Sequence, residues 1–156
     1  MRLQPIQPDG TLMDRALAVP EAAREAIGTF VGLYARAFVP PWIGYVAVEH
    51  GVPVGTCAFK SPPHDGSVEI AYFTFPEHEG RGVATRMAQQ LLTRAHATDP
   101  RVQVTAQTLP EENASTRILR KLNFVHVRNV QHPEDGLVWE WEPRPESPAN
   151  HADQRE

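Results

Sequence analysis

Residues 79–85, Glu-Gly-Arg-Gly-Val-Ala-Thr, form the segment best suited to holding a phosphate group. They separate an apolar, strand-like stretch from a strongly amphipathic one, which predicts a loop that runs from a strand into the start of a helix. Free backbone N–H groups at a helix start and the helix dipole favour an anion, and glycine lets the backbone approach it closely. An ordinary turn that needs one glycine is the alternative. We predict that six residues contact the phosphate: Gly80, Arg81, Gly82, Val83, Ala84 and Thr85.

Two familiar nucleotide-binding loops do not fit these residues. The sequence has no Gly-x-x-x-x-Gly-Lys-Ser/Thr run, which excludes a Walker-type NTPase. A Rossmann fingerprint needs a third glycine where Thr85 stands and an acidic residue at the end of the next strand, where this chain has Ala106 and Gln107. It also needs a parallel strand–helix–strand unit, whereas turn signals at residues 50–51 and 65–66 predict an antiparallel meander before the loop.

Glu69 is the best candidate for acid–base chemistry. It lies in an almost wholly apolar run, residues 68–75, that leads to the glycine loop. An amine must lose a proton before it attacks a carbonyl carbon, and a lysine-type amine with a pKa of about 10.4 is mostly protonated at pH 7. A carboxylate beside the acceptor could remove that proton. A position on the solvent face, or in an ion pair, is the alternative.

Asn113 and Ser115 stand at the start of a helix that we predict over residues 113–122. Both residue types are favoured as helix N-caps, so capping is their simplest role. Three basic residues share one face of this helix: Arg117, Arg120 and Lys121. That face is either solvated or available to an anionic ligand. The histidines show no metal-ligand spacing, and the single cysteine excludes a Cys-based zinc site.

The hydrophobic pattern supplies the elements that must position these residues. Helical periodicity predicts helices over residues 21–36, 82–97 and 113–122. Strand-like runs cover residues 43–48, 54–60, 68–75, 101–107, 124–130 and 137–142. The order is therefore helix, three strands, helix, strand, helix, two strands, which predicts an α/β (mixed α+β) domain around one central sheet.

Length and composition are those of one ordinary soluble domain. The chain has 156 residues, of which 41% are hydrophobic and 22% charged, and a net charge of −4. This acidic balance argues against a nucleic-acid partner, and no apolar run is long enough to span a membrane. We expect a cytoplasmic protein with a single domain over residues 1–142. Residues 143–156 hold no large apolar side chain, which predicts a flexible tail.

Two motifs in this order of elements make the chain resemble the GNAT superfamily of acyl-CoA-dependent N-acyltransferases, over about residues 22–142. The family's Gln/Arg-x-x-Gly-x-Gly/Ala hallmark is aligned here with Glu79, Gly82 and Ala84, of which the two small residues match. Residues 109–124 are similar to the branch that contains ribosomal-protein N-terminal acetyltransferases, in which Asn and Ser open the helix and Leu-Gly-Phe closes it. Asn123 replaces that glycine, and asparagine is the best non-glycine residue for a left-handed position.

The resemblance implies a GNAT-like fold with a central, mostly antiparallel sheet and helices on both faces. It implies transfer of an acetyl group from acetyl-CoA to a primary amine, by direct attack in a ternary complex and without a metal. Glu69 would act as general base, and Ser115 would lie near the leaving sulfur. Besides the glycine loop, the residues that the resemblance assigns to acetyl-CoA are Phe73, Thr74, Phe75, Asn113 and Lys121.

The chain also departs from the family pattern. Glu79 stands where the family has Gln or Arg, and we expect it to point to solvent, since a carboxylate beside a pyrophosphate is unfavourable. Relatives often place the helix-opening asparagine one residue earlier, at Glu112. Many members carry a late tyrosine as general acid, but this chain has Leu119, Arg120 and Lys121 there, so that role is vacant or filled elsewhere.

Two other functions stay open at this point: a non-catalytic acyl-CoA-binding or sensing domain of the same fold, and a nucleotide-binding module with other chemistry. The sequence does not name the amine acceptor either. A protein N-terminus, a polyamine, an amino acid and an antibiotic all fit. Oligomeric state, a homodimer included, is equally open.

Overall fold

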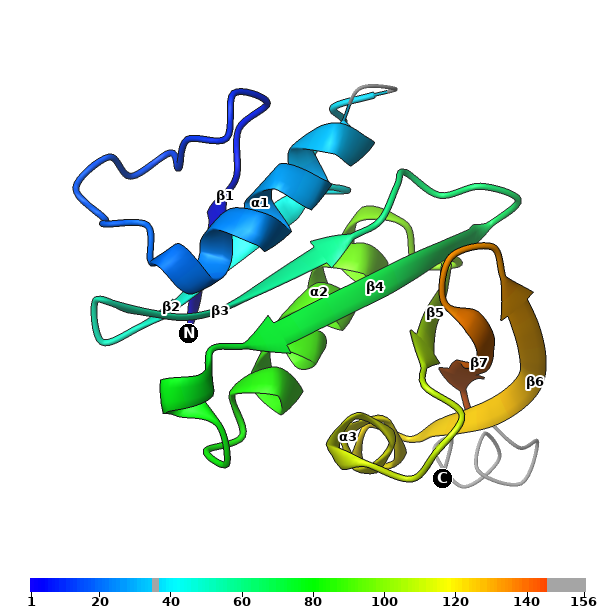
Figure 1. Ribbon diagram of the computed structural model, residues 1–156. Helices are drawn as coiled ribbons and strands as arrows, with labels where there is room; N and C mark the ends of the chain where they lie inside the picture. Colours follow the sequence, from blue (N-terminus) through cyan, green and yellow to red (C-terminus); the bar gives the residue numbers. More distant parts are fainter. Residues whose placement is uncertain (35–36, 146–156) are drawn as a thin grey trace, which may run out of the picture.

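Figure 1 shows the computed structural model of the chain, which describes residues 1–34 and 37–145. Its helices are α1 (Glu21–Leu33), α2 (Val83–Thr98) and α3 (Ala114–Lys121), with a short 3-10 turn, η1 (Pro76–His78), before α2. Its strands are β1 (Arg2–Pro5), β2 (Gly44–Glu49), β3 (Val52–Phe59), β4 (Ser67–Thr74), β5 (Gln103–Thr108), β6 (Phe124–His132) and β7 (Gly136–Pro143).

The predicted order of elements is confirmed from α1 onwards, but the sequence pattern does not reveal β1. This strand has four residues, Arg-Leu-Gln-Pro, so neither alternation nor β-branched side chains mark it. β1 pairs antiparallel with β2, where Leu3 lies opposite Ala47. It thereby forms one edge of the sheet.

The carboxyl-terminal strand extends beyond the predicted end of the domain. β7 includes Pro143, and the backbone N–H of Arg144 donates to the carbonyl oxygen of Asn123 at 2.8 Å. Asn123 has a φ of 65°, the left-handed conformation that the sequence predicts for it. The first residues of the predicted tail therefore contact the folded body, while residues 146–156 lie outside the described residues.

The strands form one sheet in the order β1-β2-β3-β4-β5-β7-β6, and helices cover both faces (Figure 1). On one face, α1 buries Ile27 and Phe30 in a cluster with Val46 of β2. On the other, α2 buries Met87 and Leu91 in the larger cluster. Both helices supply the apolar stripe that their periodicity predicts. The mixed α/β fold class is confirmed.

β4 and β5 are the only parallel neighbours in the described sheet, and they separate part of the way along (Figure 1). Their pairing runs from Ser67 opposite Gln103 to Ile70 opposite Ala106, and β4 then continues to Thr74 without it. The expectation of a plain meander before the loop is therefore incomplete. β4 pairs antiparallel with β3, but it also begins a parallel β4–α2–β5 crossover. The split leaves one edge of β4 free beside the glycine loop.

Candidate active site

A cavity of about 610 Å³ lies where β4 separates from β5, between the glycine loop and α3. It is bordered by residues of β4, η1, the start of α2 and α3 along its length. The predicted site residues that line it are Phe73, Thr74, Gly80, Gly82, Val83, Ala84, Thr85, Ser115 and Lys121. The fold thus gathers residues from two separate motifs around one space.

The glycine loop begins α2 with free N–H groups. Gly80 and Gly82 both have a φ of 76°, a left-handed conformation that side chains disfavour. Gly82 is the N-cap of α2, and no side chain from residues 1–34 or 37–145 caps the helix. The first intrahelical bond runs from the N–H of Arg86 to the carbonyl oxygen of Gly82. The N–H groups of the first turn are therefore available to an anion at the cavity wall.

Arg86 fixes this loop from the second turn of α2. Its Nη1 donates to the carbonyl oxygen of Arg81 at 2.9 Å. Its Nε and Nη2 donate to the two carboxylate oxygens of Glu49, at the end of β2, at 2.7 Å and 2.8 Å. The hydrogen bonds from Arg86 lower the pKa of Glu49 below its usual value of 4.5. Arg86 therefore ties the loop backbone to the sheet, whereas the exposed Arg81 side chain does not border the cavity.

The free edge of β4 exposes the main chain of alternate residues. The N–H of Phe75 donates to Val54 and the N–H of Lys60 to Glu69, so odd-numbered residues of β4 bond to β3. Even-numbered residues turn their N–H and C=O toward β5, and beyond Ile70 that partner is gone. The unpaired polar groups beside the cavity thus belong to Tyr72 and Thr74. Phe75, a predicted contact, is buried in the core beneath α1.

Glu69 lies in a second, smaller cavity of about 110 Å³, also at the split between β4 and β5. Lys60, which follows β3 directly, forms an ion pair with Oε2 of Glu69. That oxygen is shielded from solvent and accepts no hydrogen bond of good geometry from the described residues. The ion-pair alternative foreseen for Glu69 is therefore realised. It does not separate Glu69 from the site, because Tyr72 and Ser115 line both cavities.

Two residues near the start of α3 have different roles: one caps the helix, and the other borders the cavity. Asn113 is the N-cap, and its side-chain oxygen accepts a hydrogen bond from the N–H of Thr116 at 3.1 Å. The Thr116 hydroxyl accepts one from the N–H of Asn113 in return, which completes a capping box. Capping by Asn113 is confirmed, while capping by Ser115 is wrong. Ser115 instead borders both cavities, and Asn113 borders neither.

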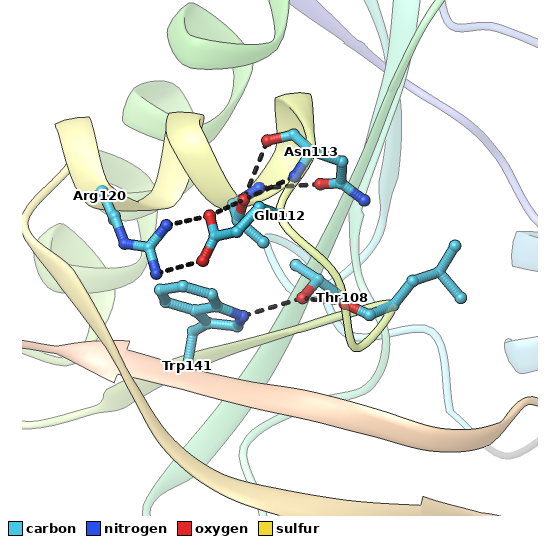
Figure 2. A network of polar contacts seen from close by, with 7 residues as sticks. Thr108, Glu112, Asn113, Arg120 and Trp141 are labelled. Carbon is cyan, nitrogen blue, oxygen red and sulfur yellow. Dashed lines mark hydrogen bonds and ion pairs between the residues drawn. The ribbon is translucent and has the colours of Figure 1, made fainter.

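An ion pair and an aromatic contact connect the last turn of α3 to the loop before it and to the sheet (Figure 2). Both terminal nitrogens of the Arg120 guanidinium contact the carboxylate of Glu112, and hydrogen bonding from Arg120 lowers the pKa of that carboxyl group. The guanidinium carbon also lies 5.1 Å from the ring centroid of Trp141. The Trp141 indole N–H donates to the Thr108 hydroxyl at 3.0 Å, inside the core. Glu112, which stands where relatives often place asparagine, therefore anchors the loop before α3.

The basic face of α3 is divided between two tasks. Arg117 and Lys121 border the large cavity, whereas Arg120 contacts Glu112 and Trp141. Glu79 is exposed, as expected, although it borders the same cavity. Sequence reasoning also missed Tyr72 and His78 at the cavity wall, and only the position of Tyr72 next to a predicted contact could have indicated it.

Tyr72 contributes a phenol to this site. It lies on β4 between the two cavities and packs against the core beneath α2. Burial raises the pKa of its hydroxyl to about 12. The phenol therefore stays protonated at neutral pH and can donate a hydrogen bond.

Residues 1–34 and 37–145 contain neither a candidate metal-binding cluster nor a candidate membrane-spanning helix. These residues contain no group of three or more histidine, cysteine or carboxylate side chains that could hold a metal ion. None of their helices combines the length and the apolar character that crossing a membrane requires.

Comparisons with known proteins agree with this arrangement. The family model of the acetyltransferase (GNAT) domain matches residues 9–125. A chimera of spermidine N-acetyltransferase SpeG from Vibrio cholerae and hSSAT has a TM-score of 0.66 at 14% identity, covering 92% of this chain and 95% of that one. RimL, a ribosomal L7/L12 α-N-protein acetyltransferase in complex with coenzyme A, has a TM-score of 0.62 at 16% identity and coverages of 82% and 74%.

An N-acetyltransferase from Staphylococcus aureus has a TM-score of 0.53 at 19% identity, covering 64% of this chain. The chain spans 65% of the length of that protein. At these identities the solved structures show a shared fold. No curated protein matches the chain.

Proposed function

Because the chain belongs to the GNAT acetyltransferase family, we propose that it transfers an acetyl group from acetyl-CoA to a primary amine. One observation carries the proposal. The large cavity begins at the anion-binding end of α2, the small cavity holds the carboxylate of Glu69, and the two meet at Tyr72 and Ser115. A donor in the first cavity and an amine in the second would meet at that junction.

The large cavity has the polar groups that coenzyme A needs. The free N–H groups at the start of α2 suit the pyrophosphate. The main chain of Tyr72 and Thr74 offers unpaired donors and acceptors to the amide groups of the pantetheine arm, like an added strand. Arg117 and Lys121 border the cavity and suit a further phosphate. RimL, which shares the fold, is in complex with coenzyme A.

Acetyl-CoA supplies an activated acetyl group as a thioester. Glu69 takes a proton from the ammonium form of the acceptor, which frees the nitrogen lone pair for attack. The N–C bond forms as the C–S bond breaks, and the proton that the new amide nitrogen loses ends on the departing sulfur. Ser115 and Tyr72 line both cavities, and in this proposal their hydroxyls donate hydrogen bonds to the charge that develops where the cavities meet. Holding both reactants in line contributes several kcal/mol, about 7 or more in ideal cases.

The experiment is an amine panel with acetyl-CoA, read by release of free thiol and by product mass. Glu69→Gln should lower kcat about 100-fold or more and leave the Kd for CoA nearly unchanged. Asp99→Asn is the matched control, because it makes the same chemical change at the far end of α2. Turnover of no amine, with CoA bound, would favour an acyl-CoA-sensing domain. An unchanged kcat and pH–rate profile in Glu69→Gln would remove Glu69 as the base.

A further inference from the structure

The small cavity carries two opposite charges side by side. Glu69 comes from β4 and Lys60 from the residue after β3, and the backbone N–H of Lys60 donates to the carbonyl oxygen of Glu69 at 2.9 Å. Their side chains form an ion pair at the cavity wall. Both side chains retain partial solvent access, 41% for Lys60 and 24% for Glu69. A ligand in the cavity can therefore reach both side chains, although Oε2 of Glu69 is itself shielded by the pair.

The charges discriminate between kinds of amine. An acceptor that carries only positive charge is attracted by Glu69. It must, however, displace Lys60 from that carboxylate, and it is then repelled by the nearby ammonium group of Lys60. A polyamine brings further positive charges to the same place. An acceptor with a carboxylate next to its amine instead replaces both halves of the ion pair, since its amine faces Glu69 and its carboxylate faces Lys60.

The size of the cavity points to the same class of acceptor. A volume of about 110 Å³ is the space of roughly four water molecules at liquid density. The amine, α-carbon and carboxylate of an α-amino acid together have five non-hydrogen atoms. Gln107 offers an amide to these polar groups, while Ile70, Ala71 and Ala106 provide apolar walls. Such a headgroup fits the cavity, with any side chain extending outward.

We propose that the acceptor is a small zwitterionic amine of the α-amino acid type, and that Lys60 is the residue that selects its carboxylate. This inference rests on the proposed acetyl transfer and names its substrate class. It separates this chain from its structural relatives, whose names specify a polyamine or a protein N-terminus as substrate. The amine of the bound zwitterion lies beside the carboxylate of Glu69 and next to the junction with the acetyl-CoA cavity.

The test compares acids with their neutral amides, for example glycine with glycinamide and alanine with alaninamide, plus 1,4-diaminobutane. The ratio of kcat/KM for acid over amide is measured in wild type, Lys60→Gln and Lys60→Arg. Because each ratio is compared between variants, the intrinsic reactivities of the amines cancel. We expect Lys60→Gln to lower the ratio tenfold or more, through loss of acid turnover, and Lys60→Arg to retain most of it.

The possible outcomes separate a failure of this inference from a failure of the proposed function. A ratio that Lys60→Gln leaves unchanged, or a wild type that prefers the diamine, overturns this inference while acetyl transfer stands. If wild type binds CoA in a calorimeter but acetylates no amine, charged or neutral, the proposed function fails and the inference falls with it. Glycinamide also stands for a protein N-terminus, so a wild-type preference for the amide that Lys60→Gln does not alter would assign that class instead.

Discussion

Substitutions at Gly80 and Gly82 can separate the effect of the glycine loop on CoA binding from the effect of backbone strain on stability. Both have a φ of 76°, so an alanine at either position is held in the left-handed region, which disfavours a side chain by about 1–2 kcal/mol. For a domain of this size each kcal/mol lowers Tm by about 2–4 °C, so both Gly80→Ala and Gly82→Ala should lose about 2–8 °C. Their surroundings differ. A Cβ on Gly80 meets no atom of the described residues within 4 Å, whereas a Cβ on Gly82 lies 3.0 Å from Nη1 of Arg86.

That contact matters because Arg86 is already held by Glu49 and by the carbonyl oxygen of Arg81. Displacing it releases the loop at the point where α2 begins. We therefore expect Gly82→Ala to weaken CoA binding at least tenfold, or about 1.4 kcal/mol, and Gly80→Ala to weaken it less than threefold. The assays are isothermal calorimetry for CoA and thermal unfolding for stability.

A double-mutant cycle sharpens this prediction. If the Cβ acts through Arg86, the effect of Gly82→Ala on CoA affinity should shrink when Arg86→Ala is already present, and the two changes should not add. Equal CoA affinities in Gly80→Ala and Gly82→Ala, at equal loss of stability, would refute the reasoning. Simple additivity in the cycle would show that the Cβ acts on the ligand and not on Arg86.

The remaining predictions concern three other residues. Ser115→Ala should lower kcat tenfold or more with little change in Tm, because Asn113 caps α3; a drop in Tm with unchanged kcat would return Ser115 to a structural role. Since Arg86 lowers the pKa of Glu49 below 4.5, this carboxylate stabilises the fold fully above that pH and loses its contribution as the pH falls below it. Glu49→Gln should therefore reduce the free energy of unfolding at pH 7 by about 0.5–1 kcal/mol and flatten its decline as the pH falls below 4.5, which urea titrations at each pH would check. Trp141→Phe removes the N–H that donates to the buried Thr108 hydroxyl and should destabilise the fold by about 1–3 kcal/mol, whereas a loss under 0.5 kcal/mol would mean that the remaining bond from this hydroxyl to the carbonyl oxygen of Leu109 is enough.

The order of elements was predictable because each long element carries its own pattern. α2 shows its apolar stripe in Met87 and Leu91, and its observed start lies one residue from the predicted one. β1 carries no such signal, because its four residues take strand form only by pairing with β2. Local pattern therefore locates the glycine loop and the start of α3, which are the two motifs of the site.

The pairing of side chains across the fold was not predictable. Arg120 and Lys121 share a helix face in sequence, yet Arg120 contacts Glu112 in the preceding loop and Trp141 on β7. The periodicity of the sequence does not indicate these contacts of Arg120, because they depend on how close β7 comes to α3. The ion pair of Lys60 with Glu69 likewise follows from the register of β3 against β4. Strand register also decides that Tyr72 and Thr74 offer free main-chain groups, while Phe75 does not.

Calorimetric titration of the folded wild-type chain with CoA tests the central claim most directly. The free N–H groups of α2, the free edge of β4 and the basic residues at the cavity predict a Kd in the micromolar range, with no comparable binding of ATP or NAD. Gly82→Val, which adds a β-branched side chain at a left-handed position on the cavity wall, should abolish the binding. Absence of CoA binding to folded wild type, or equal binding of ATP and NAD, would contradict the account.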